Sequence, residues 1–517
     1  MNRKWLMTTL ATGVVGILAL GNGCYSYTPA PEGQTGTTFT ERKLAESDKI
    51  LSDIKVLTLK QAQEIAVMNN PTYISAYHAV NAARMSYYQA LGAFSPTVSA
   101  SFTMSRPEST YFNRHGSQAN SNSFTTATGV QASWLIFDGF SRYFAAMAAK
   151  HQYEYQVDME ENSRRLLMQA VAYAYNDILL SIAQRNIALN NRQFQETNLD
   201  AAKSKLSVGA VSLSEPINFQ IGINDAINSQ MQAEYNYDLA LYNLAVLMGY
   251  SEGVLPGNIQ FEDIEIDLDA PISNIDVYLD AALNNRPDLA GYREQMEIAK
   301  YNLYDTYSAF SPTLTGTINY SFNTNKSHSY DYKEHGKYYA FESENYYNRN
   351  DFSYGLQADW VLFNGGQRYN SMRNAQALYA ASEFDLAQGW LNVVQEVRNA
   401  YANYVYSIKQ ARVYAMTLSL VDKQRELVQI EYDAGTVAIT RLNEAQTDYV
   451  DAAMNHATAL INIQNAKAEL IAAVNIDSTG YNFLDRYKEF ERHEVEMAEI
   501  LTEEAMTEES NSEPAAE

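Results

Sequence analysis

The chain contains one sequence pattern twice. The segment Ala93–Val98 returns as Ala309–Leu314, and the segment Gly129–Gly139 returns as Gly355–Gly365. The period of roughly 220 residues is far longer than the about 20–50 residues of solenoid repeats. It indicates instead that a whole structural unit is duplicated. Two such units predict a pseudo-symmetric molecule, and the content of one unit indicates its kind.

Each copy contains stretches in which apolar and polar side chains alternate. In the first copy, every second side chain is apolar from Val98 to Met104 and again from Val130 to Ile136. Alternation over about ten residues with an aromatic-rich apolar face is typical of transmembrane β-barrel strands. The alternative is a half-buried strand pair on a soluble core. The pattern predicts β-hairpins over about 96–137 and 312–363, with a polar, tyrosine-rich loop at the second tip, His328–Asn350.

Four strands cannot close a barrel. A sheet edge that faces lipid leaves backbone N–H and C=O groups without partners, and small membrane barrels have about eight strands. We therefore expect an α+β membrane protein in which each chain supplies four transmembrane strands to one shared barrel.

A very long helix follows each hairpin. The stretches from about Ser141 to Leu206 and from Gln367 to Asp433 contain no proline and almost no glycine. About 65 residues correspond to roughly 100 Å of helix, which needs partner helices along its length. Gly209 and Gly435 then fit the left-handed position just past a helix end. The chain returns from each turn, so helical hairpins are predicted over about 141–249 and 367–475.

Each copy opens with helices that break at a proline. Thr58 is a plausible cap of the first helix, and proline disfavours helical geometry in the residue before it. The breaks are Asn70-Pro71 in the first copy and Arg286-Pro287 in the second. The two copies are assigned to residues 57–273 and 274–486.

The N-terminus is typical of an export signal. Arg3 and Lys4 precede an apolar run from Trp5 to Leu20, followed by the only cysteine, Cys24. This position suggests lipidation of Cys24; the alternative is a conventional signal peptide with an uninvolved cysteine. Near the C-terminus, a glutamate-rich run predicts a solvated tail. The predicted segments are a signal peptide at 1–23, an extended leader at 24–56 and an acidic, disordered tail at 487–517.

Enzyme and nucleic-acid signals are poor. The net charge of −24 argues against binding phosphate backbones. The seven histidines are scattered without metal-ligand spacing, and a single cysteine cannot build a zinc site. Gly249–Gly253 matches the G-x-S-x-G pattern, but it follows a predicted helix instead of a strand, which favours a helix end over a nucleophile turn. No catalytic, cofactor or metal site is predicted.

Several short motifs occur in the same order in both copies. They are Asn70-Pro71, Asn285–Leu289, the two Ser-Pro pairs, Leu135–Gly139, Leu362–Gly366 and the turns that begin at Val208 and Ala434. With these motifs, the chain resembles the TolC family of outer-membrane efflux proteins from about Leu57 to Val474. The resemblance implies a homotrimer whose twelve strands form an outer-membrane barrel and whose helices form an α-barrel across the periplasm.

The resemblance also implies a function. Such a protein would be the passive exit duct of a tripartite efflux pump or type I secretion system, with a periplasmic adaptor and an inner-membrane transporter as partners. The alternative is a structural spacer or surface stalk that is anchored in the outer membrane. No sequence feature indicates the cargo.

Site residues follow from the resemblance. Tyr432 and Glu444 match family positions that constrict the inner mouth of the tunnel, whereas Arg441 replaces an acidic residue. Arg441 and Glu444 are neighbours on one helix, so a charge-paired constriction is expected, with an exposed surface pair as the alternative. Gly209 and Gly435 would meet the adaptor; the alternative is two plain turns. The corresponding positions of the first copy are Leu206, Glu215 and Asn218, which suggests that the second copy carries more of the gate.

Overall fold

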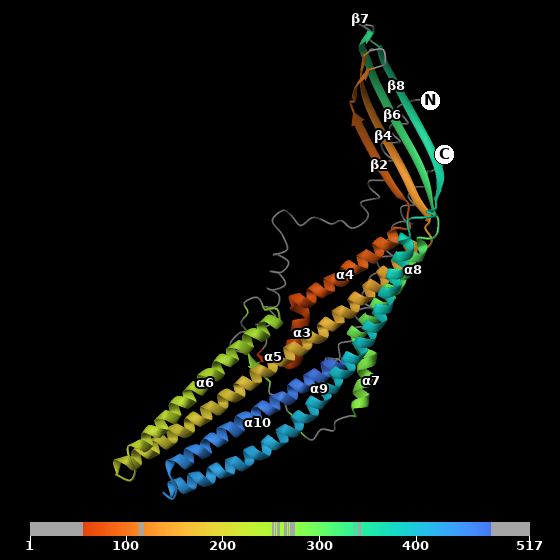
Figure 1. Ribbon diagram of the computed structural model, residues 1–517. Helices are drawn as coiled ribbons and strands as arrows, with labels where there is room; N and C mark the ends of the chain where they lie inside the picture. The colour runs from red at the N-terminus through yellow and green to blue at the C-terminus, as the bar shows by residue number, and fades with distance from the viewer. Residues whose placement is uncertain are drawn as a thin grey trace, which may run out of the picture.

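The computed structural model describes residues 55–476, apart from short gaps within 113–117, 251–273 and 335–342. The predicted signal peptide, Cys24, nearly all of the leader and the acidic tail lie outside the described residues. The described chain is elongated, with a β-sheet at one end and long helices that run away from it (Figure 1).

Each copy contributes two long antiparallel strands, as the alternating pattern predicts. β2 (Thr97–Ser105) pairs with β4 (Gln118–Phe137), and β6 (Thr313–Glu334) pairs with β8 (Ser343–Asp359). The expected loop His328–Asn350 is largely strand instead, because its tyrosines favour β structure. Short strands β3 (Glu108–Phe112) and β7 (Lys337–Tyr339) extend the two tips.

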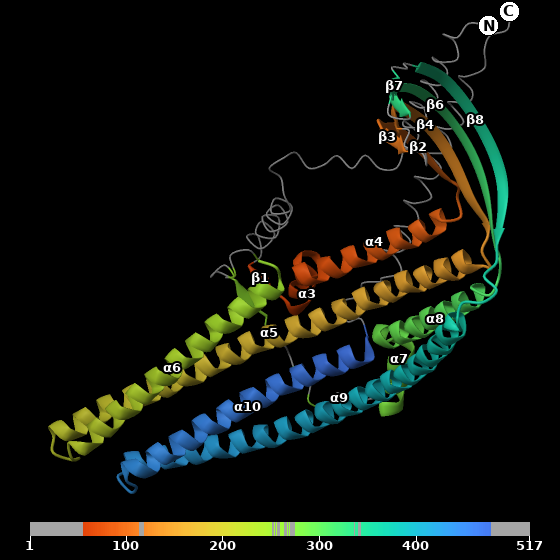
Figure 2. The same ribbon diagram turned by 45° about the horizontal axis from the view of Figure 1, so that its top comes forward.

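The two copies meet at the centre of the sheet. β4 pairs with β6 from Gln118 to Phe137, so the long strands follow the order β2-β4-β6-β8. Among the described residues, β2 and β8 each pair along one side only. The sheet is therefore open at both edges. It is also curved (Figure 2). As expected, four strands leave two edges that another chain must cover.

Each copy also has a short and a longer helix separated at an X-Pro pair. They are α3 (Leu59–Asn69), α4 (Pro71–Gly92), α7 (Ile275–Asn285) and α8 (Pro287–Ser308). Thr58 caps α3 as predicted: its hydroxyl accepts the Gln61 N–H at 3.2 Å, and the Gln61 side chain accepts the Thr58 N–H at 3.1 Å. This capping box satisfies two N–H groups that would otherwise lack partners.

The long helices have nearly the predicted bounds. α5 (Ser141–Ser207) returns as α6 (Ser214–Leu247), and α9 (Gln367–Asp433) returns as α10 (Ile439–Val474). Both long helices have 67 residues and are about 100 Å long. α5 packs against α4, α6, α8 and α10, and α9 packs against α8 and α10. Partner helices thus accompany each of them, as their length requires.

Among the described helices, α5 alone is long and apolar enough to suit a membrane span, and half of its apolar window is buried inside the protein. Val171, Tyr175 and Ile178 of α5 have no exposed surface and lie in a core with residues of α3 and α6. Packing between helices therefore accounts for the apolar character of α5.

The joint between strand and helix is the same in both copies. The Trp134 indole N–H donates to the Phe94 carbonyl at 3.0 Å, and the Arg142 guanidinium lies 5.2 Å from the Phe94 ring centroid. These contacts fix the end of the hairpin to the start of the long helix. The second copy has the corresponding contacts at 3.1 Å and 5.2 Å, made by Trp360, Phe310 and Arg368.

Candidate functional site

The turn between α5 and α6 and the turn between α9 and α10 lie at the helix ends far from the sheet (Figure 1). The helix bounds place the predicted aperture and adaptor-contact residues in or beside these two turns. Gly209 and Gly435 have φ values of 74° and 76°. The Ala210 N–H donates to the Lys205 carbonyl at 2.9 Å, and the matching bond of the second turn is also 2.9 Å. This is the predicted glycine geometry of a helix end. Among the described atoms, none beyond the adjoining residues lies within 4 Å of a Cβ built on either glycine, so both turns are open.

Tyr432 links the ends of the two helical hairpins. Its side chain is 5 % exposed, and its hydroxyl donates a 2.8 Å hydrogen bond to Glu215 Oε2 on α6. Its ring meets Phe219 edge-on, with centroids 6.2 Å apart. Burial, followed by the hydrogen bond and charge of Glu215, raises the pKa of Tyr432 well above its ordinary value. The hydroxyl therefore keeps its proton and remains a donor.

Further contacts join the same ends. Lys205 Nζ lies 4.6 Å from the Tyr432 ring centroid and 3.7 Å from Asp433 Oδ1. The Gln429 side chain donates to Asn198 Oδ1 at 3.2 Å. The two hairpin ends are thus packed together. An apolar cluster contributed by α5, α6, α9 and α10 includes Leu199, Phe219, Ile223, Val428 and Leu442.

The predicted charge pair also forms. Arg441 Nη1 lies 2.7 Å from Glu444 Oε2, but the two side chains are 43 % and 61 % exposed. An exposed pair at this spacing contributes only about 0.3–0.5 kcal/mol. A hydrogen bond to a charged acceptor contributes about 1.5–3 kcal/mol. The contact between Tyr432 and Glu215 is therefore the stronger of the two.

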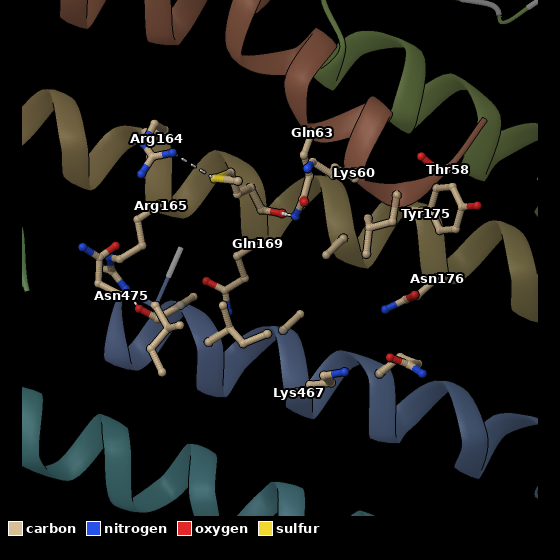
Figure 3. A pocket seen from close by; sticks show the side chains of 18 of the residues that line it. Thr58, Lys60, Gln63, Arg164, Arg165, Gln169, Tyr175, Asn176, Lys467 and Asn475 are labelled. Atoms are coloured by element: carbon tan, nitrogen blue, oxygen red, sulfur yellow. Dashed lines mark hydrogen bonds between the residues drawn. The ribbon is translucent and has the colours of Figure 1, made fainter. Parts of the chain in front are cut away.

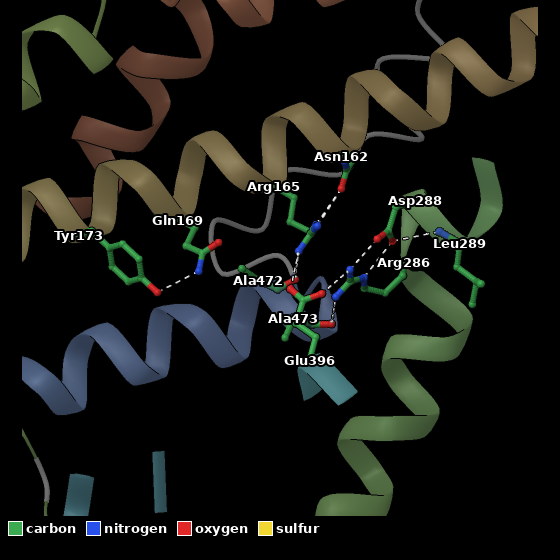
Figure 4. Close-up of polar contacts among 10 residues, drawn as sticks. All are labelled: Asn162, Arg165, Gln169, Tyr173, Arg286, Asp288, Leu289, Glu396, Ala472 and Ala473. Carbon is green, nitrogen blue, oxygen red and sulfur yellow. Dashed lines mark hydrogen bonds and ion pairs between the residues drawn. The ribbon is translucent and has the colours of Figure 1, made fainter. Parts of the chain in front are cut away.

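Two arginines contact the C-terminal end of α10 (Figure 4). Arg165 of α5 donates to the Ala472 carbonyl at 2.9 Å, and Arg286 donates to the Ala473 carbonyl at 3.0 Å. The last carbonyls of a helix lack partners inside it and carry the negative end of its dipole, so cationic donors stabilise this end. Arg286 also pairs with Asp288 at 2.6 Å and Glu396 at 2.8 Å.

A groove of about 590 Å³ lies beside this network, lined by residues of α3, α5 and α10 (Figure 3). Asn176 is 1 % exposed; its Nδ2 donates to Asn465 at 2.8 Å, and its Oδ1 has no partner among the described residues. The described chain ends at Ile476 in the groove wall. The described lining of the groove holds neither histidine nor cysteine. The groove lining therefore offers no group that ordinarily titrates near neutrality.

The segment that matches the hydrolase pattern follows a helix, as predicted. Gly249 has φ 69°, and the Tyr250 N–H donates to the Ala245 carbonyl at 2.9 Å, which closes the end of α6. Ser251 lies outside the described residues. The strand that must precede a nucleophile turn is replaced here by a helix.

The chain matches the family described as Outer membrane efflux protein over residues 63–250 and 278–475. The chain belongs to this family. One matched segment lies within each of the two copies. Members of this family are channel proteins.

Known relatives agree with this family assignment. Alkaline protease secretion protein AprF of Pseudomonas aeruginosa is 25 % identical over 385 residues, which cover 73 % of this chain and 75 % of AprF. Outer membrane protein TolC of Escherichia coli is 22 % identical over 370 residues, which cover 70 % and 72 %. The solved structure of the Campylobacter jejuni CmeC outer membrane channel has a TM-score of 0.69 at 17 % identity, and the match covers 83 % and 88 %.

These findings confirm the predicted fold class and location. The protein is an outer-membrane exit channel that extends into the periplasm. Among the described residues, β2 and β8 each keep one unpaired edge, and strands that cross a membrane need such edges covered.

Sequence reasoning placed Tyr432, Arg441 and Glu444 together at the hairpin end, and they lie there. It missed that Glu215 is the partner of Tyr432, because the two residues are 217 positions apart and belong to different copies. The sequence signal for this contact was the acidic side chain of Glu215, which lies in the first turn of α6, just after the Gly209 turn. This contact uses Glu215 of the first copy and Tyr432 of the second copy, so both copies contribute to it.

Proposed function

We propose that this outer-membrane channel is the passive duct of a tripartite efflux pump or type I secretion system, and that its hairpin ends close its inner mouth. The hydrogen bond from Tyr432 to Glu215 carries this proposal. It joins the hairpin of the first copy to that of the second at their tips, through side chains that can separate without unfolding a helix. Arg441 and Glu444 would line the same mouth as a minor, charge-paired element.

Opening would require the hairpin ends to move apart. Each chain would then lose the bond between Tyr432 and Glu215, the ion pair between Lys205 and Asp433, and part of the apolar cluster beneath them. A partner that binds the open form about 5.5 kcal/mol more tightly would shift the population from 1:99 to 99:1. The closed mouth would thus hold at rest and yield to a bound partner.

The partner would be a periplasmic adaptor that contacts the turns at Gly209 and Gly435. Both turns are open, and the residues around them are mostly small and apolar. Such a surface suits close packing of helical tips. The chain has no phosphate-loop motif, so an inner-membrane transporter would supply the energy. The proposal includes polypeptide secretion because the relative AprF is a protease secretion protein. It includes efflux because the matching family is described as Outer membrane efflux protein.

Purified protein in planar lipid bilayers tests the duct. We expect particles of three chains that conduct ions, with low resting conductance because the mouth is closed. Addition of the cognate adaptor should raise the conductance. Folded trimers that conduct neither alone, nor with adaptor, nor after substitution of Tyr432 would instead favour the structural spacer.

A further inference from the structure

A histidine and two glutamates converge between α5 and α8, far along the helices from the hairpin ends. His151 Nδ1 lies 2.6 Å from Glu294 Oε2 and 3.1 Å from Glu154 Oε2. The ligating atoms of the three side chains all lie within 4.8 Å of one another. His151 and Glu154 are one turn apart on α5, whereas Glu294 lies on α8. The group therefore joins the first copy to the second.

We propose that His151, Glu154 and Glu294 bind a divalent transition-metal cation that clamps α5 to α8. Imidazole nitrogen and carboxylate oxygen are the ligands that Zn²⁺ takes at about 2.0–2.2 Å, so neighbouring ligands around a tetrahedral ion stand about 3.4 Å apart. The two distances measured from His151 differ from this value by less than 1 Å. Bundle proteins build metal sites in the same way, from an i, i+3 pair on one helix and a carboxylate on another.

Two of the three side chains, those of His151 and Glu294, are held in place before any ion binds. The His151 ring stacks on Tyr301, with centroids 5.3 Å apart and ring planes 18° from parallel. The His151 and Glu294 side chains are 18 % and 24 % exposed. Ligands fixed by packing lose little freedom when they bind. A water molecule or exchangeable ligand can complete the coordination from the open side.

The charges around the site favour a cation. Asp158 lies one turn beyond Glu154 on α5, so a third acidic side chain stands near the two glutamates. The described cationic neighbours are Lys150, which is 3.3 Å from Glu154, and Arg293, which is next to Glu294 on α8. A divalent ion bound to Glu154 and Glu294 would reduce the repulsion between these acidic side chains. The alternative is a direct contact of His151 with both glutamates without metal.

The test uses the full-length trimer in detergent, purified without a polyhistidine tag and stripped with a chelator. Zn²⁺ is titrated by calorimetry, and Co²⁺ is followed by its visible absorption. We expect one ion per chain in this site and at least tenfold weaker binding in Glu294→Gln. The matched control is Glu297→Gln on the same helix, whose carboxylate pairs with Lys300 at 2.8 Å; it should bind like the wild type.

One further variant, His151→Gln, keeps the test decisive. His151→Gln should lose the Co²⁺ absorption, and Zn²⁺ should raise the melting temperature of the wild type but not of this variant. Equal binding in the wild type, Glu294→Gln and His151→Gln would overturn the proposal and leave the metal-free ion pair. Bilayer conductance of the same variants reports on the duct separately, because His151 and Glu294 lie outside the proposed aperture.

Discussion

At the residue scale, the hydroxyl of Tyr432 is the group on which we expect closure of the proposed inner mouth to depend most. Tyr432→Phe removes the hydrogen bond to Glu215 and keeps the ring packed on Phe219. A loss of about 1.4 kcal/mol corresponds to a tenfold change in an equilibrium, and hydrogen bonds to charged groups reach this size. We expect the open probability in single-channel recordings to rise about tenfold.

The combined variant Arg441→Ala, Glu444→Ala is the matched comparison. It removes an ion pair at the same hairpin end, but the pair is exposed and contributes little. Its conductance should therefore rise less than that of Tyr432→Phe. A larger effect of the double variant would move the main closing contact from Tyr432 to the charge pair.

Contacts of single residues could be predicted where both partners are close together in the sequence. Thr58 and Gln61 are three positions apart, so the capping box can be found in the sequence alone. The contact of Tyr432 with Glu215 and the approach of His151 to Glu294 depend on which helices lie side by side. Such pairs become visible only once the two copies are packed together.

At the element scale, the end of α10 depends on a charged network with a definite response to pH. Burial by itself would raise the pKa of Asp288, but the hydrogen bond and charge of Arg286 outweigh it, so this pKa is lowered. An acid with a lowered pKa in the folded state stabilises the fold above its unfolded pKa of about 3.9 and loses that contribution as pH falls through the folded pKa. The network should weaken below about pH 4.

Asp288→Asn tests this response. The variant should melt at a lower temperature than the wild type at pH 7, and the difference should shrink as pH falls below about 4 because the wild type then loses the same charge. Thermal melts between pH 3 and pH 7 measure it. Asp200→Asn, at a side chain that is 81 % exposed, should match the wild type throughout. A difference for Asp288→Asn that is constant with pH would exclude the charge as its cause.

Elements were predictable where residues that end helices mark them. The turns at Gly209 and Gly435 fixed the long helices almost to the residue. The tip at 328–350 was wrongly predicted as loop, since polarity alone does not distinguish a loop from a strand whose backbone is paired. The copies also perform one task with different residues: Asn70 donates to the end of α6 and Arg286 to the end of α10. Sequence repetition could not reveal that equivalence.

At the scale of the whole molecule, the strand count required other chains, but only the family supplied the number three. The alternating pattern makes a further demand on the assembled barrel. On β8, Tyr354 lies opposite Ile318 and Ser353 lies opposite Asn319. One face of the sheet is thus apolar across strands and the other polar, so lipid should contact the Tyr354 face and the channel interior the Ser353 face.

Adjacent substitutions on β8 test that assignment. Tyr354→Arg would place a charge against lipid, which costs about 2–4 kcal/mol near the bilayer centre, and every chain of the trimer would carry it. We expect heat-stable trimers in outer-membrane fractions to fall sharply. Ser353→Arg, one residue away, would face water in the channel, so trimers should form normally and ion selectivity should shift toward anions. Loss of trimers in Ser353→Arg with normal assembly of Tyr354→Arg would mean that the faces are reversed, and equal effects would mean that this strand does not separate lipid from water.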